Sequence, residues 1–231
     1  PTAMAKAFDD STDISKLGPN DTLGIGYIRE LEKLQSSIEV STIQRTNDYH
    51  ATDITGSFIS ATAARNLIKQ KIDVSSYLPY DITKMALHFN DDYFSLLKYK
   101  IISETDLSKY QTVDEGIEHR LKKYVLEANN FDELIQKVKT KRYTYHKLSR
   151  MFIHILTSFT KEEGRIYKEP TYIRILGFNH KGRQYLKKIK KNCPLPILTK
   201  YQAGYPMLEI ESRTSLIYDQ SLEYRQKTIQ K

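Results

Sequence analysis

The sequence is poor in the residues that define disulfide-rich and membrane-spanning proteins. Cys193 is the only cysteine among the 231 residues, so neither a disulfide nor a cysteine-based zinc site can form within the chain. No apolar run approaches the ~20 residues that cross a bilayer, and the N-terminal residues lack the basic and then apolar pattern of a signal peptide. We therefore expect a soluble protein of the cytoplasm with no membrane partner.

Acidic residues outnumber basic ones only in the first part of the chain. Residues 1–70 contain seven Lys and Arg and nine Asp and Glu. Residues 71–231 contain 29 Lys and Arg and 19 Asp and Glu. The whole formal charge of +8 therefore originates after residue 70. Such asymmetry is typical of a module that binds a polyanion, although a merely lysine-rich surface gives the same count.

The first 70 residues have the pattern of an α/β fold. Their apolar spacing predicts a helix over residues 21–35, a strand over 38–44, a loop over 45–58, and a helix from residue 60 or 62 to about 70. Asn20 or Asp21 can cap the first of these helices. The order resembles the later half of an α/β nucleotide-binding domain.

The pattern becomes mostly helical after a linker at residues 71–81. Apolar spacing predicts helices over residues 91–102, 114–128, 131–138 and 144–159. A strand over 171–177, a basic helix over 180–191 and a strand over 196–199 predict a small βαβ element. A last helix is predicted over residues 213–224.

Residues 59–65 have a pattern that is suited to phosphate binding. Ser60 and Thr62 begin a predicted helix, and Arg65 follows one turn later. Hydroxyl groups, free backbone N–H groups and an arginine at a helix start form a suitable cradle for phosphate. The alternative is an ordinary N-cap followed by a surface arginine.

Five stretches are informative when they are read in order. They are Pro-Asn-Asp-Thr-Leu-Gly-Ile-Gly-Tyr at 19–27, Thr-Ile-Gln-Arg at 42–45, Ile-Ser-Ala-Thr-Ala-Ala-Arg at 59–65, Lys-Thr-Lys-Arg-Tyr-Thr-Tyr at 139–145, and Tyr-Ile-Arg-Ile-Leu-Gly-Phe at 172–178. Together they resemble the bacterial tRNA(Met) cytidine acetate ligase family of His-x-Gly-His nucleotidyltransferases. Ala61 and Ala64 depart from the Ile-Ser-Ser-Thr-x-Ile-Arg segment of these enzymes. The Ser, Thr and Arg positions of the segment remain.

The resemblance implies an ATP-dependent ligase that activates acetate as acetyl-adenylate and acetylates N4 of the wobble cytidine in elongator tRNA(Met). It implies Mg²⁺ bound mainly through the ATP phosphates, and no metal site of the protein's own. The implied ATP-binding residues are Asn20, Arg45, Ser60, Thr62 and Arg65. Asn20 as a mere helix cap and Arg45 as a surface charge at a strand end stay open as alternatives.

The sequence lacks the family's catalytic His-x-Gly-His motif. None of the six histidines, His50, His88, His119, His146, His154 and His180, lies two or three residues from another. We expect that the N-terminal catalytic segment is missing from this chain and that the chain alone is inactive, with its catalytic residues unknown. The alternative is a relative that has lost catalysis.

A tyrosine-rich basic segment follows residue 138 and contains no acidic residue up to position 150. Basic groups can pair with phosphates, and tyrosine rings can stack on unpaired anticodon bases. The alternative is a set of core tyrosines beside a solvated basic face. The residues predicted to bind tRNA are Lys139, Lys141, Arg142, Tyr143, Tyr145, Lys147 and Arg150, together with Lys187 and Lys188 of the basic helix.

We therefore predict two domains. Residues 1–70 form the C-terminal part of a Rossmann-like nucleotidyltransferase domain, and residues 71–231 form a basic, mainly helical tRNA-binding domain with the small βαβ element. The alternatives are an adenylyltransferase that makes a small cofactor, which leaves the basic domain unexplained, and a non-catalytic RNA-binding protein. The oligomeric state stays open.

Overall fold

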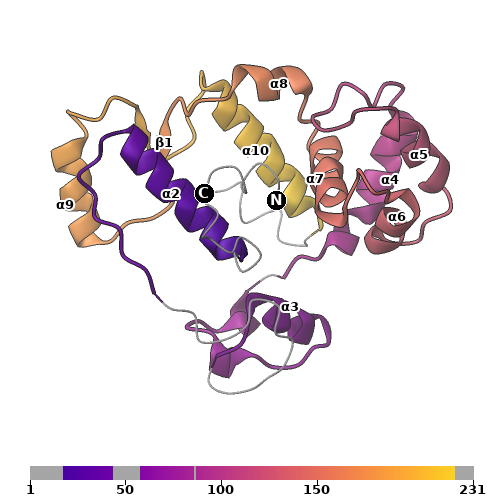
Figure 1. The fold of residues 1–231 in the computed structure, drawn as a ribbon, viewed down its shortest axis with the longest axis horizontal. Helices are drawn as coiled ribbons and strands as arrows, with labels where there is room; N and C mark the ends of the chain where they lie inside the picture. Colours follow the sequence, from indigo (N-terminus) through magenta and orange to yellow (C-terminus); the bar gives the residue numbers. More distant parts are fainter. Residues whose placement is uncertain (1–17, 44–57, 86, 222–231) are drawn as a thin grey trace, which may run out of the picture. The chain divides into compact units, whose positions relative to one another are not determined.

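The computed structural model describes residues 18–43, 58–85 and 87–221 (Figure 1). The chain divides into two compact units, Pro1–Met85 and Ala86–Lys231. The sequence placed its boundary at residue 70, whereas the structure groups residues 71–85 with the first unit. These residues contain two short 3₁₀ helices, η2 (Ser75–Tyr77) and η3 (Ile82–Lys84).

The first helix of the described chain is α2 (Pro19–Lys33). Pro19 suits the first helical position because the N–H that it lacks has no partner inside a helix. Gly18 is the N-cap, and its N–H donates to Asp21 Oδ2 at 2.8 Å. Neither predicted residue is therefore the N-cap itself, since Asn20 and Asp21 both lie inside the first turn. Asp21 does contribute to the cap, because its carboxylate accepts the N–H of Gly18.

The predicted strand over residues 38–44 was also wrong for its described part. Residues 38–43 have no regular structure, and Ile38, Val40 and Ile43 are 68%, 53% and 95% exposed. A strand needs a neighbour for its backbone hydrogen bonds. The part of the chain that the structure describes places no strand beside this segment.

The second helix of the first unit is α3 (Ala61–Lys69). Its N-cap is Ser60, whose hydroxyl accepts a hydrogen bond from the N–H of Ala63 at 3.0 Å. Ala63, Ala64 and Leu67 form its buried face. The cap and this apolar spacing confirm the helix predicted from residue 60 onward.

The core of the second unit lies among four helices: α4 (Phe94–Ser103), α5 (Ile117–Tyr124), α6 (Phe131–Val138) and α7 (Tyr145–Leu156). Helix α7 packs against both α4 and α6, and α5 packs against α6. The 3₁₀ turn η4 (Asn90–Tyr93) leads directly into α4. Phe131 and Phe152 meet edge-to-face at the centre of this core, with ring centroids 5.2 Å apart. All four helices were predicted, because each carries apolar residues at helical spacing.

Two features shorten or extend the predicted helices. Helix α5 begins at Ile117 rather than near 114 because Gly116 has φ +77°, a left-handed conformation that glycine adopts without strain. Helix α10 (Pro206–Tyr218) begins seven residues before the predicted start, with Pro206 in its first turn. It ends in the short 3₁₀ helix η5 (Asp219–Ser221).

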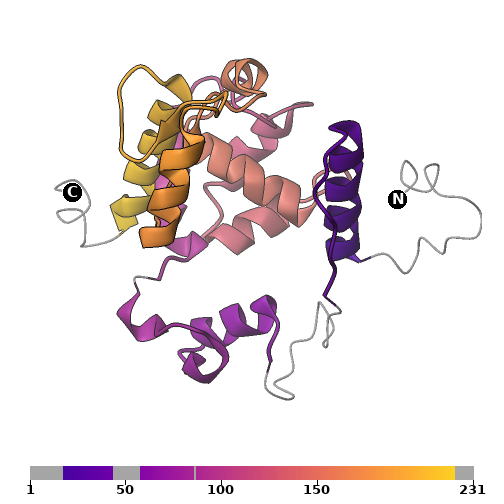
Figure 2. The ribbon, with the colours of Figure 1, turned by 90° about the vertical axis from the view of Figure 1, so that its left-hand side faces the viewer.

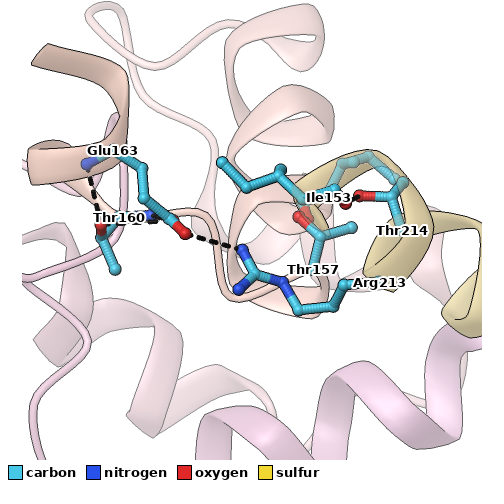
Figure 3. A network of polar contacts seen from close by, with 7 residues as sticks. Ile153, Thr157, Thr160, Glu163, Arg213 and Thr214 are labelled. Carbon is cyan, nitrogen blue, oxygen red and sulfur yellow. Dashed lines mark hydrogen bonds and ion pairs between the residues drawn. The ribbon is translucent and has the colours of Figure 1, made fainter. Parts of the chain in front are cut away.

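A short helix that the sequence did not predict, α8 (Lys161–Ile166), starts with a capping box. The N–H of Glu163 donates to Thr160 Oγ1 at 3.1 Å, and the N–H of Thr160 donates to Glu163 Oε2 at 2.8 Å. The other Glu163 oxygen accepts from Arg213 of α10 at 3.0 Å (Figure 3). Burial alone would raise the pKa of the Glu163 carboxyl, but the bonds from Thr160 and Arg213 hold it below its usual value. This ion pair joins α10 to the start of α8.

The predicted βαβ element is confirmed, with shorter strands than expected. Strand β1 (Ile173–Arg174) pairs in parallel with β2 (Ile197–Leu198), and the register sets Ile173 opposite Ile197. Helix α9 (His180–Ile189) forms the connection between them. Each strand has two residues, and the sheet has two strands.

The carboxylate of Glu104 ties the end of α4 to the loop that follows it. Its oxygens accept from the Tyr110 hydroxyl at 2.7 Å and lie 2.9 Å from Lys109 Nζ. These hydrogen bonds lower the pKa of Glu104 to about 2. A lowered carboxyl pKa stabilises the fold above the unfolded-state pKa of about 4.3, and the stabilisation disappears as the pH falls toward 2.

We expect Glu104→Gln to remove part of the acid sensitivity of the second unit. Hydrogen bonds to a charged group contribute about 1.5–3 kcal/mol, so the variant should be less stable by that amount at neutral pH. The difference from the wild type should shrink between pH 4.5 and pH 2. Urea unfolding at a series of pH values measures this, and a constant difference across that window would contradict the assignment.

Candidate nucleotide and RNA contact sites

The predicted ATP-binding residues of the first unit lie on two helices and one undescribed segment. Asn20 is exposed in the first turn of α2, and the structure assigns it no hydrogen bond within the described residues. The interpretation of Asn20 as a helix cap is thereby excluded. Arg45 lies outside the described residues, so its predicted role stays a prediction.

The start of α3 brings three predicted residues together. Ser60 is 2% exposed and acts as the cap, whereas Thr62 and Arg65 are exposed within the first turn and a half. The N–H groups of Ala61 and Thr62 have no backbone partner within the described chain, as is normal for the first turn of a helix. These N–H groups form the positive end of the α3 helix dipole. A phosphate can bind there, with the Thr62 hydroxyl and the Arg65 guanidinium as further donors.

The tyrosine-rich basic segment is more neutralised than its sequence indicates. Arg142 pairs with Glu115 at 3.0 Å, and Lys147 Nζ lies 4.1 Å from the centre of the Tyr143 ring. Lys139, Lys141 and Arg150 are exposed. Among the described residues, these three cations have neither an ion pair nor a ring contact.

Tyr143 lies in the core of the second unit. It is 4% exposed, and its hydroxyl donates to the backbone oxygen of Asp114 at 2.6 Å. Burial raises the pKa of this hydroxyl, with the nearby Glu115 carboxylate as the next cause. A buried ring with a bonded hydroxyl cannot stack on a base in this conformation, so the geometry favours the core alternative over the predicted stacking role.

Tyr145 and His154 are also engaged within the protein. The hydroxyl of the half-buried Tyr145 donates to Asp132 Oδ1 at 2.6 Å, and burial together with this bond raises its pKa to about 12. His154 Nδ1 lies 2.9 Å from the backbone oxygen of Gln111, and burial lowers the pKa of its ring. His154 therefore adds no positive charge to the α7 face at neutral pH.

Helix α9 separates the two lysines that the sequence grouped together. Lys187 lines a groove of about 300 Å³ between α9 and β2, whereas Lys188 is exposed and lies outside that lining. Arg183, Leu186, Lys190, Ile197 and Thr199 complete the lining. The sequence analysis missed Arg183 and Lys190 as site residues, although their i, i+4 and i+7 spacing with Lys187 places all three on one helical face.

The described residues also lack two kinds of feature. No helix among them is long and apolar enough to cross a membrane. Within the same residues, no group of three or more His, Cys, Asp or Glu side chains is arranged to hold a metal ion.

A helix start with a fixed serine cap and an exposed arginine is followed along the chain by a basic helical unit. Comparison with known proteins gives the class. The model of the HIGH Nucleotidyl Transferase family matches residues 1–231, and the chain belongs to this family. The predicted fold class is thereby confirmed, since this family's catalytic domain is Rossmann-like.

The chain is similar to curated tRNA(Met) cytidine acetate ligases. It is 37% identical to the protein of Oceanobacillus iheyensis over 227 residues, which cover 91% of this chain and 56% of that protein. It is 36% identical to the protein of Geobacillus sp. (strain WCH70), with coverage of 94% and 60%. The chain thus spans less than two thirds of the length of these relatives.

Solved structures of Thermotoga maritima TmcAL have a similar fold. The apo form I superposes with a TM-score of 0.75 at 27% identity, covering 90% of this chain and 57% of that one. The form bound to alpha-thio ATP superposes with a TM-score of 0.74 at 26% identity, covering 97% and 60%. The resemblance inferred from the five sequence stretches is confirmed.

Proposed function

We propose that the chain supplies a nucleotide-phosphate segment and the tRNA-binding part of an ATP-dependent ligase. The complete enzyme would activate acetate as acetyl-adenylate and acetylate N4 of the wobble cytidine in elongator tRNA(Met). The observation that carries the proposal is the start of α3, where Ser60 is fixed as the cap while Thr62 and Arg65 remain exposed. The names of the similar proteins and the ATP analogue in one of the solved structures support it.

In the first reaction an acetate oxygen attacks the α-phosphorus of ATP and pyrophosphate leaves. The start of α3 would hold phosphate oxygens through the Thr62 hydroxyl and the first-turn N–H groups. Arg65 would neutralise the negative charge that builds on the leaving group. Asn20 would donate its amide N–H to the nucleotide, Arg45 would bind a phosphate oxygen, and Mg²⁺ would accompany the ATP phosphates.

In the second reaction the cytidine N4 amine attacks the acetyl carbonyl carbon and AMP leaves. The second unit would hold the tRNA for this step through its exposed cations. Lys139, Lys141 and Arg150 of the tyrosine-rich segment would pair with phosphates, and Lys187 would do so from α9. Arg142, Lys147 and Lys188 would strengthen the general positive field, and Tyr145 would support the segment through its bond to Asp132.

Arg65→Ala in the complete enzyme should weaken the use of ATP and leave tRNA binding unchanged. One charge-assisted hydrogen bond to phosphate contributes about 1.5–3 kcal/mol, so kcat/KM for ATP should fall roughly tenfold to hundredfold. Acetate-dependent exchange of pyrophosphate into ATP measures this step alone. Lys69→Ala is the matched control, since Lys69 is an exposed cation in the last turn of the same helix. Equal effects of the two substitutions would remove Arg65 from the site.

A non-catalytic RNA-binding protein is the second candidate function. It is favoured by one observation, the absence of a His-x-Gly-His motif from the 231 residues. The sequence encoded upstream of Pro1 in the complete gene decides between the two. A complete gene product without the motif would support the RNA-binding protein, and one that contains it would support the ligase.

A further inference from the structure

The groove between α9 and β2 collects three cations on one side. Arg183 and Lys187 line it from α9, and Lys190 lines it from the C-cap of that helix. Ile197 of β2 and Thr199, which follows β2, line the other side (Figure 2 turns the side with α9 toward the viewer). Its volume of about 300 Å³ is at the small end of the range for ligand sites, about 300–1,000 Å³. A groove of this size admits one nucleotide and not a double helix.

The segment that builds the groove contains no acidic residue. From Pro170 to Leu208 the sequence has eight Lys and Arg and neither Asp nor Glu. Among the described residues, Arg174 is the one member of these eight with an ion pair, to Glu211 at 3.3 Å. The three cations of the groove therefore lie on one helical face without a described counter-ion.

This arrangement costs the free protein some stability. Like charges at i, i+4 spacing, such as Arg183 and Lys187, destabilise a helix. Lys187 lies in the last turn of α9, where a cation also interacts favourably with the helix dipole. The dipole does not account for Arg183, which is near the start of the helix, where a cation is unfavourable. A bound anion would relieve the repulsion among all three.

The groove differs from the tyrosine-rich segment in this respect. In that segment Arg142 is paired with Glu115, and Lys147 lies over the ring of Tyr143. The α9 groove also adds apolar side chains, Leu186 and Ile197, beside its cations. Cations next to apolar surface suit a phosphate that carries a sugar and a base, because the base and sugar then cover the apolar groups.

We infer that this groove binds one nucleotide of the tRNA. Its phosphate lies among Arg183, Lys187 and Lys190, and its sugar and base lie against Leu186 and Ile197. The inference rests on the proposed function and deepens it, because it names the place where one tRNA phosphate is held. Lys181 and Lys188 lie on the opposite face of α9 and contribute only to the general attraction.

Two double variants of the full 231-residue chain distinguish binding of a phosphate in the groove from general electrostatic attraction of the tRNA. Arg183→Gln with Lys187→Gln removes two charges from the groove, and Lys181→Gln with Lys188→Gln removes two from the opposite face. All four side chains are exposed and belong to one helix. Filter binding of elongator tRNA(Met) transcript across a salt series measures both affinity and its salt dependence, and a thermal melt of each variant confirms that it is folded.

The groove variant should lose about tenfold to hundredfold in tRNA affinity. Its slope of log affinity against log salt should fall by about one, as expected for one phosphate. The opposite-face variant should lose less than about threefold, and Lys187→Arg should bind as the wild type does. Equal losses in both double variants would overturn the groove as a site while leaving tRNA binding intact.

Two other outcomes would contradict the inference, one of them together with the proposed function. If the groove variant keeps its tRNA affinity but binds ATP more weakly in a fluorescence titration, the groove holds a free nucleotide and the inference is overturned. If the wild-type chain binds no tRNA at low salt, the tRNA-binding part of the proposed function fails, and the inference fails with it. The failure of the inference alone is therefore distinguishable from the failure of the function.

Discussion

Replacing Tyr143 by alanine should lower the free energy of unfolding of the second unit by about 3–5 kcal/mol, the usual cost of truncating a buried aromatic side chain. The ring is 4% exposed, and its hydroxyl donates to the Asp114 backbone oxygen at 2.6 Å. Truncation would leave a cavity and an unpaired carbonyl. The salt dependence of tRNA binding should not change, because no cation is removed. Urea unfolding and a salt titration on the same protein measure the two effects.

Tyr99→Ala is the matched control for this experiment. Tyr99 lies on α4 and is 71% exposed, so its loss should change the unfolding free energy by less than about 0.5 kcal/mol. A Tyr143→Ala variant that unfolds like the wild type and binds tRNA more weakly would restore the base-stacking role. Loss of stability without loss of binding by the folded protein would establish the core role.

The purified 231-residue chain should form no acetyl-adenylate from ATP and acetate. It contains no His-x-Gly-His motif, the motif on which phosphoryl transfer depends in the resembling family. Each lost contact to the charge that develops in a transition state costs roughly 10²–10³-fold in rate, so the loss of both histidines should bring the reaction below detection. Acetate-dependent pyrophosphate exchange measures this.

The same preparation serves as its own control for folding. It should bind elongator tRNA(Met) at low salt, since the basic second unit is present. Acetate-dependent exchange above background would show that the 231 residues contain a complete active site. Binding without exchange is the expected result.

The helices of the second unit could be predicted because each buries one apolar stripe at helical spacing. Leu148, Phe152 and Ile155 of α7 are all fully buried, as the spacing requires. The six-residue α8 was missed because so short a helix shows no stripe. Its signal was the capping pair Thr160 and Glu163.

The strand predicted over residues 38–44 failed for a different reason. Alternating apolar residues show that a strand at this position would have one apolar face. They do not show whether a neighbouring strand is present to complete the backbone hydrogen bonds. Ile38 and Val40 alternate correctly and yet are exposed in the described chain. The strands at 173–174 and 197–198 formed because each has the other as a partner.

The two candidate sites were predictable to different degrees. The start of α3 depends on residues within one turn, so the spacing of Ser60, Thr62 and Arg65 was sufficient. The groove depends on β2 lying beside α9, which no local pattern reveals. Tyr143 had two interpretations in the sequence, because a tyrosine among lysines suits both a core and an RNA-binding face. Burial and the bond to Asp114 separate them.

Under the proposed function, this chain is part of an enzyme that acetylates elongator tRNA(Met). Mass spectrometry of the wobble nucleoside, after incubation of the tRNA with the complete enzyme, ATP and acetate, tests it most directly. We expect N4-acetylcytidine at that position. It should be absent when either ATP or acetate is omitted, and strongly reduced by Arg65→Ala. An unmodified cytidine from an enzyme that binds both ATP and the tRNA would contradict it.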